Sequence, residues 1–117
     1  MAHSSMLRRS CQASDIAIDM RVVADPTRTC SVGSYRELIE FTDALLQGDA
    51  NALDEARERL RFVVGDAGVV RAAAIVGNFQ MMNRALDTLG ATLGEAMPSQ
   101  IRALAEELGV DAPDHWR

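Results

Sequence analysis

Lysine is absent from this chain, because all twelve basic residues are arginine. A Schiff-base lysine and the lysine of a phosphate-binding P-loop are therefore excluded. Histidine is almost absent too, since His3 and His115 stand near the two ends of the sequence. A Ser-His-Asp or Cys-His site would need a terminus to fold back over the body, so we expect neither kind of site.

Cysteine is scarce, and Cys11 and Cys30 fit neither a C-x-x-C motif nor a zinc-ligand spacing. They are candidate catalytic residues only as a distant redox pair, and the alternative is two inert thiols. No Glu-x-x-His pair is present, so the helically spaced carboxylates, such as Glu37 and Glu40, are interpreted as solvated. We expect no metal site and no cofactor.

Long apolar runs are lacking: the longest, over residues 69–77, is interrupted by Arg71 and is too short to span a bilayer. Arg8 and Arg9 are followed by a polar stretch rather than the apolar region of a signal peptide, so we expect a cytoplasmic protein. Only five residues are aromatic, which leaves aliphatic side chains to build the core and favours closely packed helices.

Negative charge dominates the body of the chain, whose formal net charge is −5. Residues 1–34 hold four arginines and three aspartates, whereas residues 35–117 hold eight arginines against fourteen carboxylates. Because so acidic a body repels phosphate groups, we expect neither nucleic acid nor a membrane surface as a partner.

Helical periodicity predicts an all-α fold, a small bundle of about four helices with a long, buried central helix. The N-terminal segment, residues 1–33, is expected to be irregular or partly ordered, and residues 34–117 to form the helical domain. The four helices are predicted over residues 35–47, 50–64, 67–89 and 99–108, each followed by a glycine. Ser34 with Glu37, Asp49 or Asn51, and Asp66 are the expected caps.

Two weaker patterns occupy the ends of the chain. Residues 16–22 alternate apolar and polar side chains, which suits a short strand, although Ser14 or Asp15 could equally cap one or two helical turns. The helix over residues 99–108 carries a narrow apolar strip that suits docking on another surface, made by Ile101, Leu104, Ala105 and Leu108.

The third predicted helix changes character along its length. Its first half, residues 67–77, is apolar nearly all round and is expected to be buried. Its second half carries a polar stripe, Gln80, Asn83, Arg84 and Asp87, at helical spacing and expected part-way inside. One interpretation is an Arg84–Asp87 pair that holds a bundle or dimer together, and the other is a pocket wall for an anionic or carbonyl ligand.

A motif on this helix, N-F-Q-x-M-x-R-x-x-D-x-x-G, runs from Asn78 to Gly90. With the order of the preceding helices, it resembles the C-terminal half of the carboxymuconolactone decarboxylase / alkylhydroperoxidase D-like family over about residues 34–94. The resemblance implies an all-helical fold that assembles as dimers, trimers or hexamers. Redox members of that family reduce hydroperoxides with a C-x-x-C pair, and where it would stand this chain has Ser14 and Ala17, with Arg21 for the nearby histidine.

The resemblance therefore implies a non-redox relative that keeps the packing half of the fold and acts as a homo-oligomeric scaffold or a small-ligand-binding domain. A half-fold leaves an apolar face of the third helix uncovered, and self-association would cover it. The polar residues expected at the ligand site or interface are Asn78, Gln80, Asn83, Arg84 and Asp87. The alternatives are a peroxidase-type or decarboxylase-type enzyme of the same family and a helical protein-interaction partner.

Overall fold

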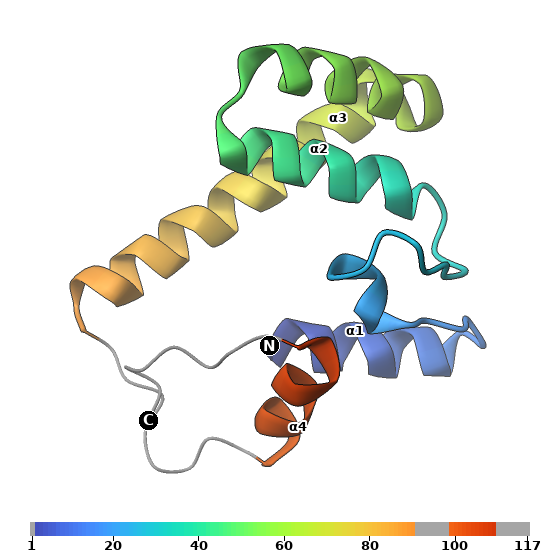
Figure 1. Ribbon diagram of the computed structural model, residues 1–117, viewed down its shortest axis with the longest axis vertical. Helices are drawn as coiled ribbons and strands as arrows, with labels where there is room; N and C mark the ends of the chain where they lie inside the picture. The colour runs from blue at the N-terminus through green and yellow to red at the C-terminus, as the bar shows by residue number, and fades with distance from the viewer. Residues whose placement is uncertain (1, 91–98, 110–117) are drawn as a thin grey trace. The chain divides into compact units, whose positions relative to one another are not determined.

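The structure, a computed structural model, describes residues 2–90 and 99–109, and every regular element in those ranges is helical. The elements are α1 (Ala2–Ala13), the short 3₁₀ helix η1 (Met20–Val23), α2 (Tyr35–Gln47), α3 (Ala50–Thr88) and α4 (Ser99–Leu108) (Figure 1). The predicted all-α class is thus confirmed. The chain divides into two compact units, Gly33–Ala91 and a first unit made of Met1–Val32 with Thr92–Arg117.

The ends of α2 and α3 are defined by local backbone chemistry. Gly48 ends α2 with a left-handed backbone, and its N–H donates to the Ala44 carbonyl. Asp49 then caps α3, because its carboxylate accepts hydrogen bonds from the N–H groups of Asn51 and Ala52 at 2.9 and 3.1 Å. The predicted capping box at Ser34 is wrong: a capping side chain needs extended backbone, whereas Ser34 has φ 55° and makes no cap bond.

The predicted boundary at Gly65 is a break within α3, where the backbone has φ 72° and ψ 173°. It separates a first segment, residues 50–64, from a second segment, residues 66–88. A Cβ at Gly68 would lie 2.4 Å from Cγ2 of Val64, so the second segment can begin beside the end of the first only with a glycine there. Asp66, expected as a cap, accepts a hydrogen bond from the Arg61 side chain at 2.7 Å.

The core of the Gly33–Ala91 unit lies where α2 meets both segments of α3. It consists of five buried side chains, Phe41, Ala44, Ala56, Leu60 and Val69. Leu60, from the first segment, is fully buried. Burying a Leu or Phe side chain stabilises a fold by about 1.5–3 kcal/mol. A core of five side chains therefore gives α2 and α3 only a small stabilisation.

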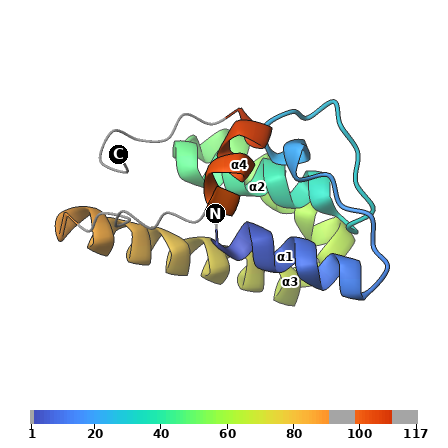
Figure 2. The same cartoon turned by 90° about the horizontal axis from the view of Figure 1, so that it is seen from below.

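The second segment of α3 is long, as predicted, but it is not the buried helix that the apolar run over residues 67–77 indicated. Val69 is its one buried residue within the described chain, while Val70 is 68% and Ile75 59% exposed. Figures 1 and 2 both show the segment extending past the end of α2. Its burial fails because α2 and the first segment cover only one side of it.

The first unit holds a helix where the sequence indicated an irregular segment. Residues 2–13 form α1, although Cys11 is its one buried residue among the described side chains, so no apolar stripe marks the helix in the sequence. Arg8 of α1 donates two hydrogen bonds of 2.9 Å to the Glu107 carboxylate of α4. These contacts tie α1 to α4 within the unit.

The strand interpretation of residues 16–22 is also wrong, because the chain there leads into η1, capped by the Asp19 side chain. The buried residues of η1, Met20 and Val22, belong to the same unit as Ala105 of α4. Of the expected docking strip, Ala105 is buried and Leu108 half-buried. The side chains of Ile101 and Leu104 lie outside the described residues.

Candidate functional site

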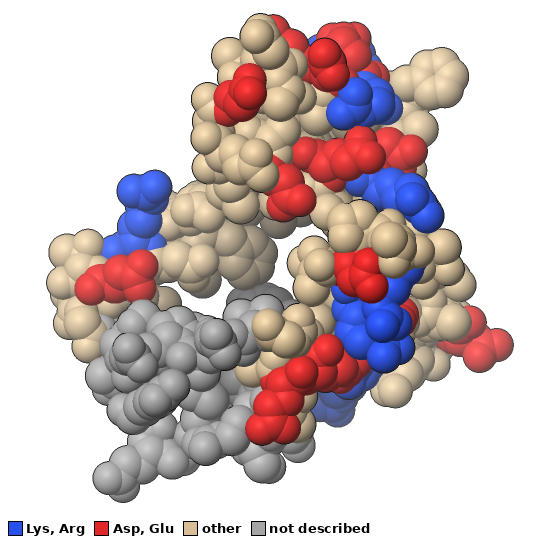
Figure 3. All heavy atoms as spheres, viewed as in Figure 1, with Lys and Arg blue, Asp and Glu red and all other residues tan. Residues whose placement is uncertain are grey.

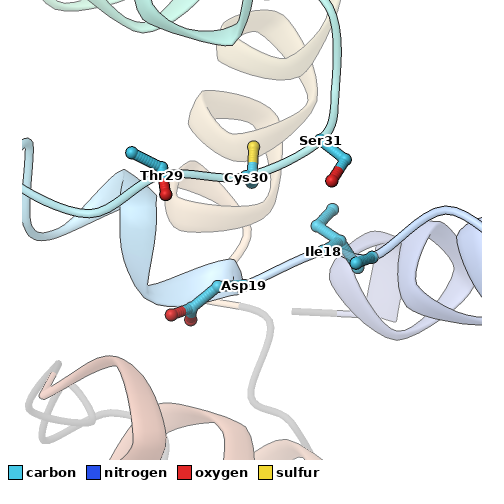
Figure 4. Close-up of a pocket in the computed structure, with 6 residues that line it drawn as sticks. Ile18, Asp19, Thr29, Cys30 and Ser31 are labelled. Atoms are coloured by element: carbon cyan, nitrogen blue, oxygen red, sulfur yellow. The ribbon is translucent and has the colours of Figure 1, made fainter.

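A groove of about 310 Å³ runs between two extended stretches of the first unit (Figure 4). The stretches are joined by a hydrogen bond of 3.2 Å from the Ser31 N–H to the Ala17 carbonyl. The groove is lined by Ala17, Ile18, Asp19, Thr29, Cys30 and Ser31. The Cys30 thiol and the Asp19 carboxylate therefore line the same groove.

The Asp19 carboxylate is already engaged in ion pairs. Arg21 donates to it through Nε at 2.8 Å and Nη2 at 2.9 Å, and Arg28 through Nη1 at 3.2 Å. The hydrogen bonds from Arg21 hold the pKa of Asp19 well below its usual range. Hydrogen bonds from Thr27 likewise lower the pKa of the neighbouring Asp25. Because such carboxylates stay ionised and paired, their contribution here is structural rather than proton transfer.

The lowered pKa of Asp19 predicts an acid-dependent loss of stability. A depressed pKa in the folded state contributes stability above the unfolded value of 3.8, and that contribution disappears as pH falls towards the folded value. We expect Asp19→Asn to be less stable than the parent by a constant margin at pH 7 to 5, with the margin shrinking below about pH 4. Urea unfolding of both proteins across this range measures it, and a margin that grows in acid would contradict the role given to Asp19.

The two cysteines differ in environment, and both are free thiols. Cys11 is buried in α1 and is not among the groove residues, whereas Cys30 is half-buried at the groove. Figure 4 shows the Cys30 sulfur and the Asp19 carboxylate pointing in opposite directions. The groove therefore does not supply an acid or base beside the Cys30 thiol, and the distant redox pair stays a prediction.

The predicted polar stripe lies on the second segment of α3, but it is less buried than expected. Gln80 is half-buried, and Asn78, Asn83, Arg84 and Asp87 are exposed. The expected Arg84–Asp87 ion pair does not form in the part of the chain that the structure describes. The pair had been expected because a buried charge needs a partner, and exposure removes that requirement.

Sequence reasoning anticipated an uncovered apolar face on this helix but did not identify its residues. We call it the outer face, and its large side chains are Val70, Ile75, Met81, Met82, Leu86 and Leu89, all exposed in the chain. At 100° per residue, Asp87 lies on the same side as the buried Val69, five full turns earlier. Gln80, Asn83, Arg84 and Asp87 thus continue the core-facing side, whereas Asn78 lies with the outer face on the opposite side. The helical period of 3.6 residues was the signal in the sequence from which the outer-face residues could have been identified.

Arg59 and Arg61, on the first segment of α3, pair with carboxylates of α2 and α3. Arg59 contacts Glu40 and Glu55 at 3.1 and 3.6 Å, and Arg61 pairs with Glu58 and Asp66. On the face drawn in Figure 3, arginines stand next to carboxylates. These arginines therefore do not combine into a basic patch that would attract a polyanion.

In residues 2–90 and 99–109, no group of three or more His, Cys, Asp or Glu side chains is placed to hold a metal ion. No helix in the same ranges combines the length and hydropathy needed to cross a membrane. His3 lies in α1 but its side chain, like His115, is outside the described part.

Comparison with protein-family models, with curated proteins and with solved structures finds no match to this chain.

Proposed function

We propose that this chain is a non-redox, alkylhydroperoxidase / carboxymuconolactone decarboxylase-like helical protein that acts as a homo-oligomeric scaffold. The observation that carries the proposal is the outer face of α3. Met81 is 63% exposed and Leu89 79% exposed, on a helix whose other side builds the core. Contiguous apolar surfaces of this kind mark interaction sites in soluble proteins.

The small size of the core supports association. The Gly33–Ala91 unit has 59 residues and five buried core side chains, and domains of that size are marginal unless further surface is buried. Each large side chain of the outer face adds about 1.5–3 kcal/mol when fully buried, before the entropic cost of association is subtracted. An oligomer would therefore add a second core on the uncovered side of α3.

The family assignment in this proposal rests on the N-F-Q-x-M-x-R motif and on helices of the expected order. The motif starts at Asn78 and lies on the second segment of α3. The chain has no C-x-x-C motif, and Cys11 and Cys30 stand apart as a buried thiol and a groove thiol. A scaffold role without redox chemistry is the function that these residues support best.

A ligand role for four of the polar residues, Gln80, Asn83, Arg84 and Asp87, is compatible with association through the outer face, because they lie on the opposite side of the helix from it. Neither these four residues nor Asn78, which lies on the outer face, lines the groove of the first unit. The exposed apolar face therefore favours the scaffold over the ligand-binding domain as the primary function.

Analytical ultracentrifugation of the purified chain tests the proposal. We expect a sedimenting mass that is a multiple of 12.7 kDa and that falls towards the single-chain mass on dilution. A sharp, fully folded species of single-chain mass at every concentration, with helical circular dichroism, would contradict the scaffold function.

A further inference from the structure

Asn78 occupies the centre of the outer face in both directions. Along the helix it is midway between Ala67 and Leu89, eleven residues from each. Around the helix it lies at the mean direction of the exposed apolar side chains, by the 100° step per residue. It is exposed, and its Nδ2 contacts only a weak acceptor in the described chain, the Met82 sulfur at 3.7 Å.

The face is also symmetric in composition about this asparagine. Residues three, four, seven, eight and eleven positions away on either side share its face, because these are the helical same-side spacings. On both sides they are apolar except for one arginine: Ile75 and Met81, Ala74 and Met82, Arg71 and Ala85, Val70 and Leu86, and Ala67 and Leu89.

From this symmetry we infer that the occupant of the outer face is the same face of a second copy, antiparallel, with the two Asn78 side chains meeting at the two-fold axis. The inference rests on the proposed scaffold function and specifies its interface. A two-fold axis at Asn78 brings each residue level with its symmetric counterpart in the other chain. Met82 then meets Ala74, Leu89 meets Ala67 and Arg71 meets Ala85, so a large side chain faces a small one at three of the five levels.

Charge favours this antiparallel arrangement over a parallel one. Arg71 is the only ionisable residue among those that share the face. In the antiparallel pair, the two Arg71 positions are fourteen residues apart along the helices, or about 21 Å at 1.5 Å per residue. In a parallel, in-register pair they would stand at the same level and repel each other. Opposite Ala85, the arginine stem can cover apolar surface while its guanidinium reaches solvent.

The amide of Asn78 suits a two-fold axis because it carries both a donor and an acceptor. Two such side chains at one level can satisfy each other, whereas a shift of register by three or four residues would leave each amide buried against apolar side chains. A single polar residue in an apolar helical seam sets register and orientation in this way.

The size of the face is also sufficient. Six large side chains of about 100 Å² each amount to on the order of 600 Å² per chain, most of the roughly 800 Å² that each partner of a stable interface buries. The flanking alanines add to that area. A second copy is therefore an occupant that matches the face in pattern, charge and extent.

Cysteine cross-linking tests the geometry, in a Cys11→Ala, Cys30→Ser background that removes the native thiols. We expect Asn78→Cys to form a disulfide-linked dimer under mild oxidation, since a disulfide needs Cα atoms within about 7 Å. Arg71→Cys alone should give at least about tenfold less disulfide-linked dimer, because the two cysteines of the pair stand too far apart. Mixing Arg71→Cys with Ala85→Cys chains should restore cross-linking between unlike chains.

Sedimentation of the unmodified chain separates the possible failures. Cross-linking by both single variants would show a parallel pair, and cross-linking by neither in an associating protein would place the interface elsewhere. Both results overturn the inference and leave the scaffold function standing. If the unmodified protein sediments as a single chain, with the outer face covered by another part of that chain, both the inference and the scaffold function are overturned.

A second measurement avoids replacing the buried Cys11. In the otherwise unchanged protein, Asn78→Asp puts two carboxylates at the axis and should weaken association at least about tenfold at pH 7. The same substitution at Asn51, exposed at the start of α3, is the matched control and should leave association unchanged. Equal effects at both positions would overturn the inference.

Discussion

Replacing Met81 by glutamate is expected to dissociate the proposed oligomer while leaving each chain folded. Met81 is 63% exposed on the outer face of α3, so the single chain tolerates a charge there. In the paired state the carboxylate would lie level with Ile75 of the other copy, buried without a partner. Such burial costs about 3 kcal/mol or more, which corresponds to at least a hundredfold rise in the dissociation constant.

Met6→Glu is the matched control for this prediction. Met6 is 64% exposed, almost the same as Met81, but it belongs to α1 in the other unit of the chain. The two variants therefore make the same chemical change at equally exposed methionines. Sedimentation velocity should show loss of association for Met81→Glu alone, with circular dichroism unchanged in both. Retained association in the Met81 variant would remove the outer face as the interface.

Replacing Gly65 by alanine is expected to destabilise the fold by about 1–3 kcal/mol, because the break in α3 needs a backbone that only glycine adopts readily. Its φ of 72° with ψ of 173° lies outside even the left-handed helical region that asparagine can occupy. No side chain crowds the position, since a Cβ there would have no neighbour within 4 Å. The penalty therefore comes from the backbone rather than from packing.

Gly48 allows backbone strain to be separated from other effects of substitution. It also has open space around it, but its φ of 76° and ψ of 15° are left-handed helical. Asparagine should therefore be accepted at Gly48 at a cost well under that of alanine, yet it should be as damaging as alanine at Gly65. Urea unfolding of the four variants measures this. An asparagine rescue at Gly65 would show that the break relaxes into an ordinary helix end.

The positions of the helices after residue 34 follow from local signals. Gly48, Gly65 and Gly109 interrupt apolar patterns of helical period, and a glycine with positive φ stands at each of these points in the structure. Asp49 caps α3, because its short carboxylate side chain stands directly before the helix and accepts a hydrogen bond from the Asn51 N–H. These features depend on a few neighbouring residues, so the amino-acid sequence alone specifies them.

The N-terminal helix escaped sequence reasoning because its cause is not local. One buried cysteine and an ion pair with Glu107, ninety-nine residues away, replace the apolar stripe that would have marked α1. The alternation over residues 16–22 resembled a strand, but the backbone bond from Ser31 to Ala17 does not extend into a strand ladder in residues 2–90 and 99–109. The Asp19 cap and its two arginines favour a short turn instead.

By itself, the sequence determined the all-helical class, the helix boundaries after residue 34 and the polar stripe, because helical period and glycine punctuation are properties of adjacent residues. Only the tertiary structure decided which side of α3 faces the core. Because α2 and the first segment of α3 cover one side of a helix that is apolar nearly all round, residues 67–77 are not enclosed, and the outer face remains exposed. Burial depends on what lies opposite, which a residue's neighbours in sequence do not specify.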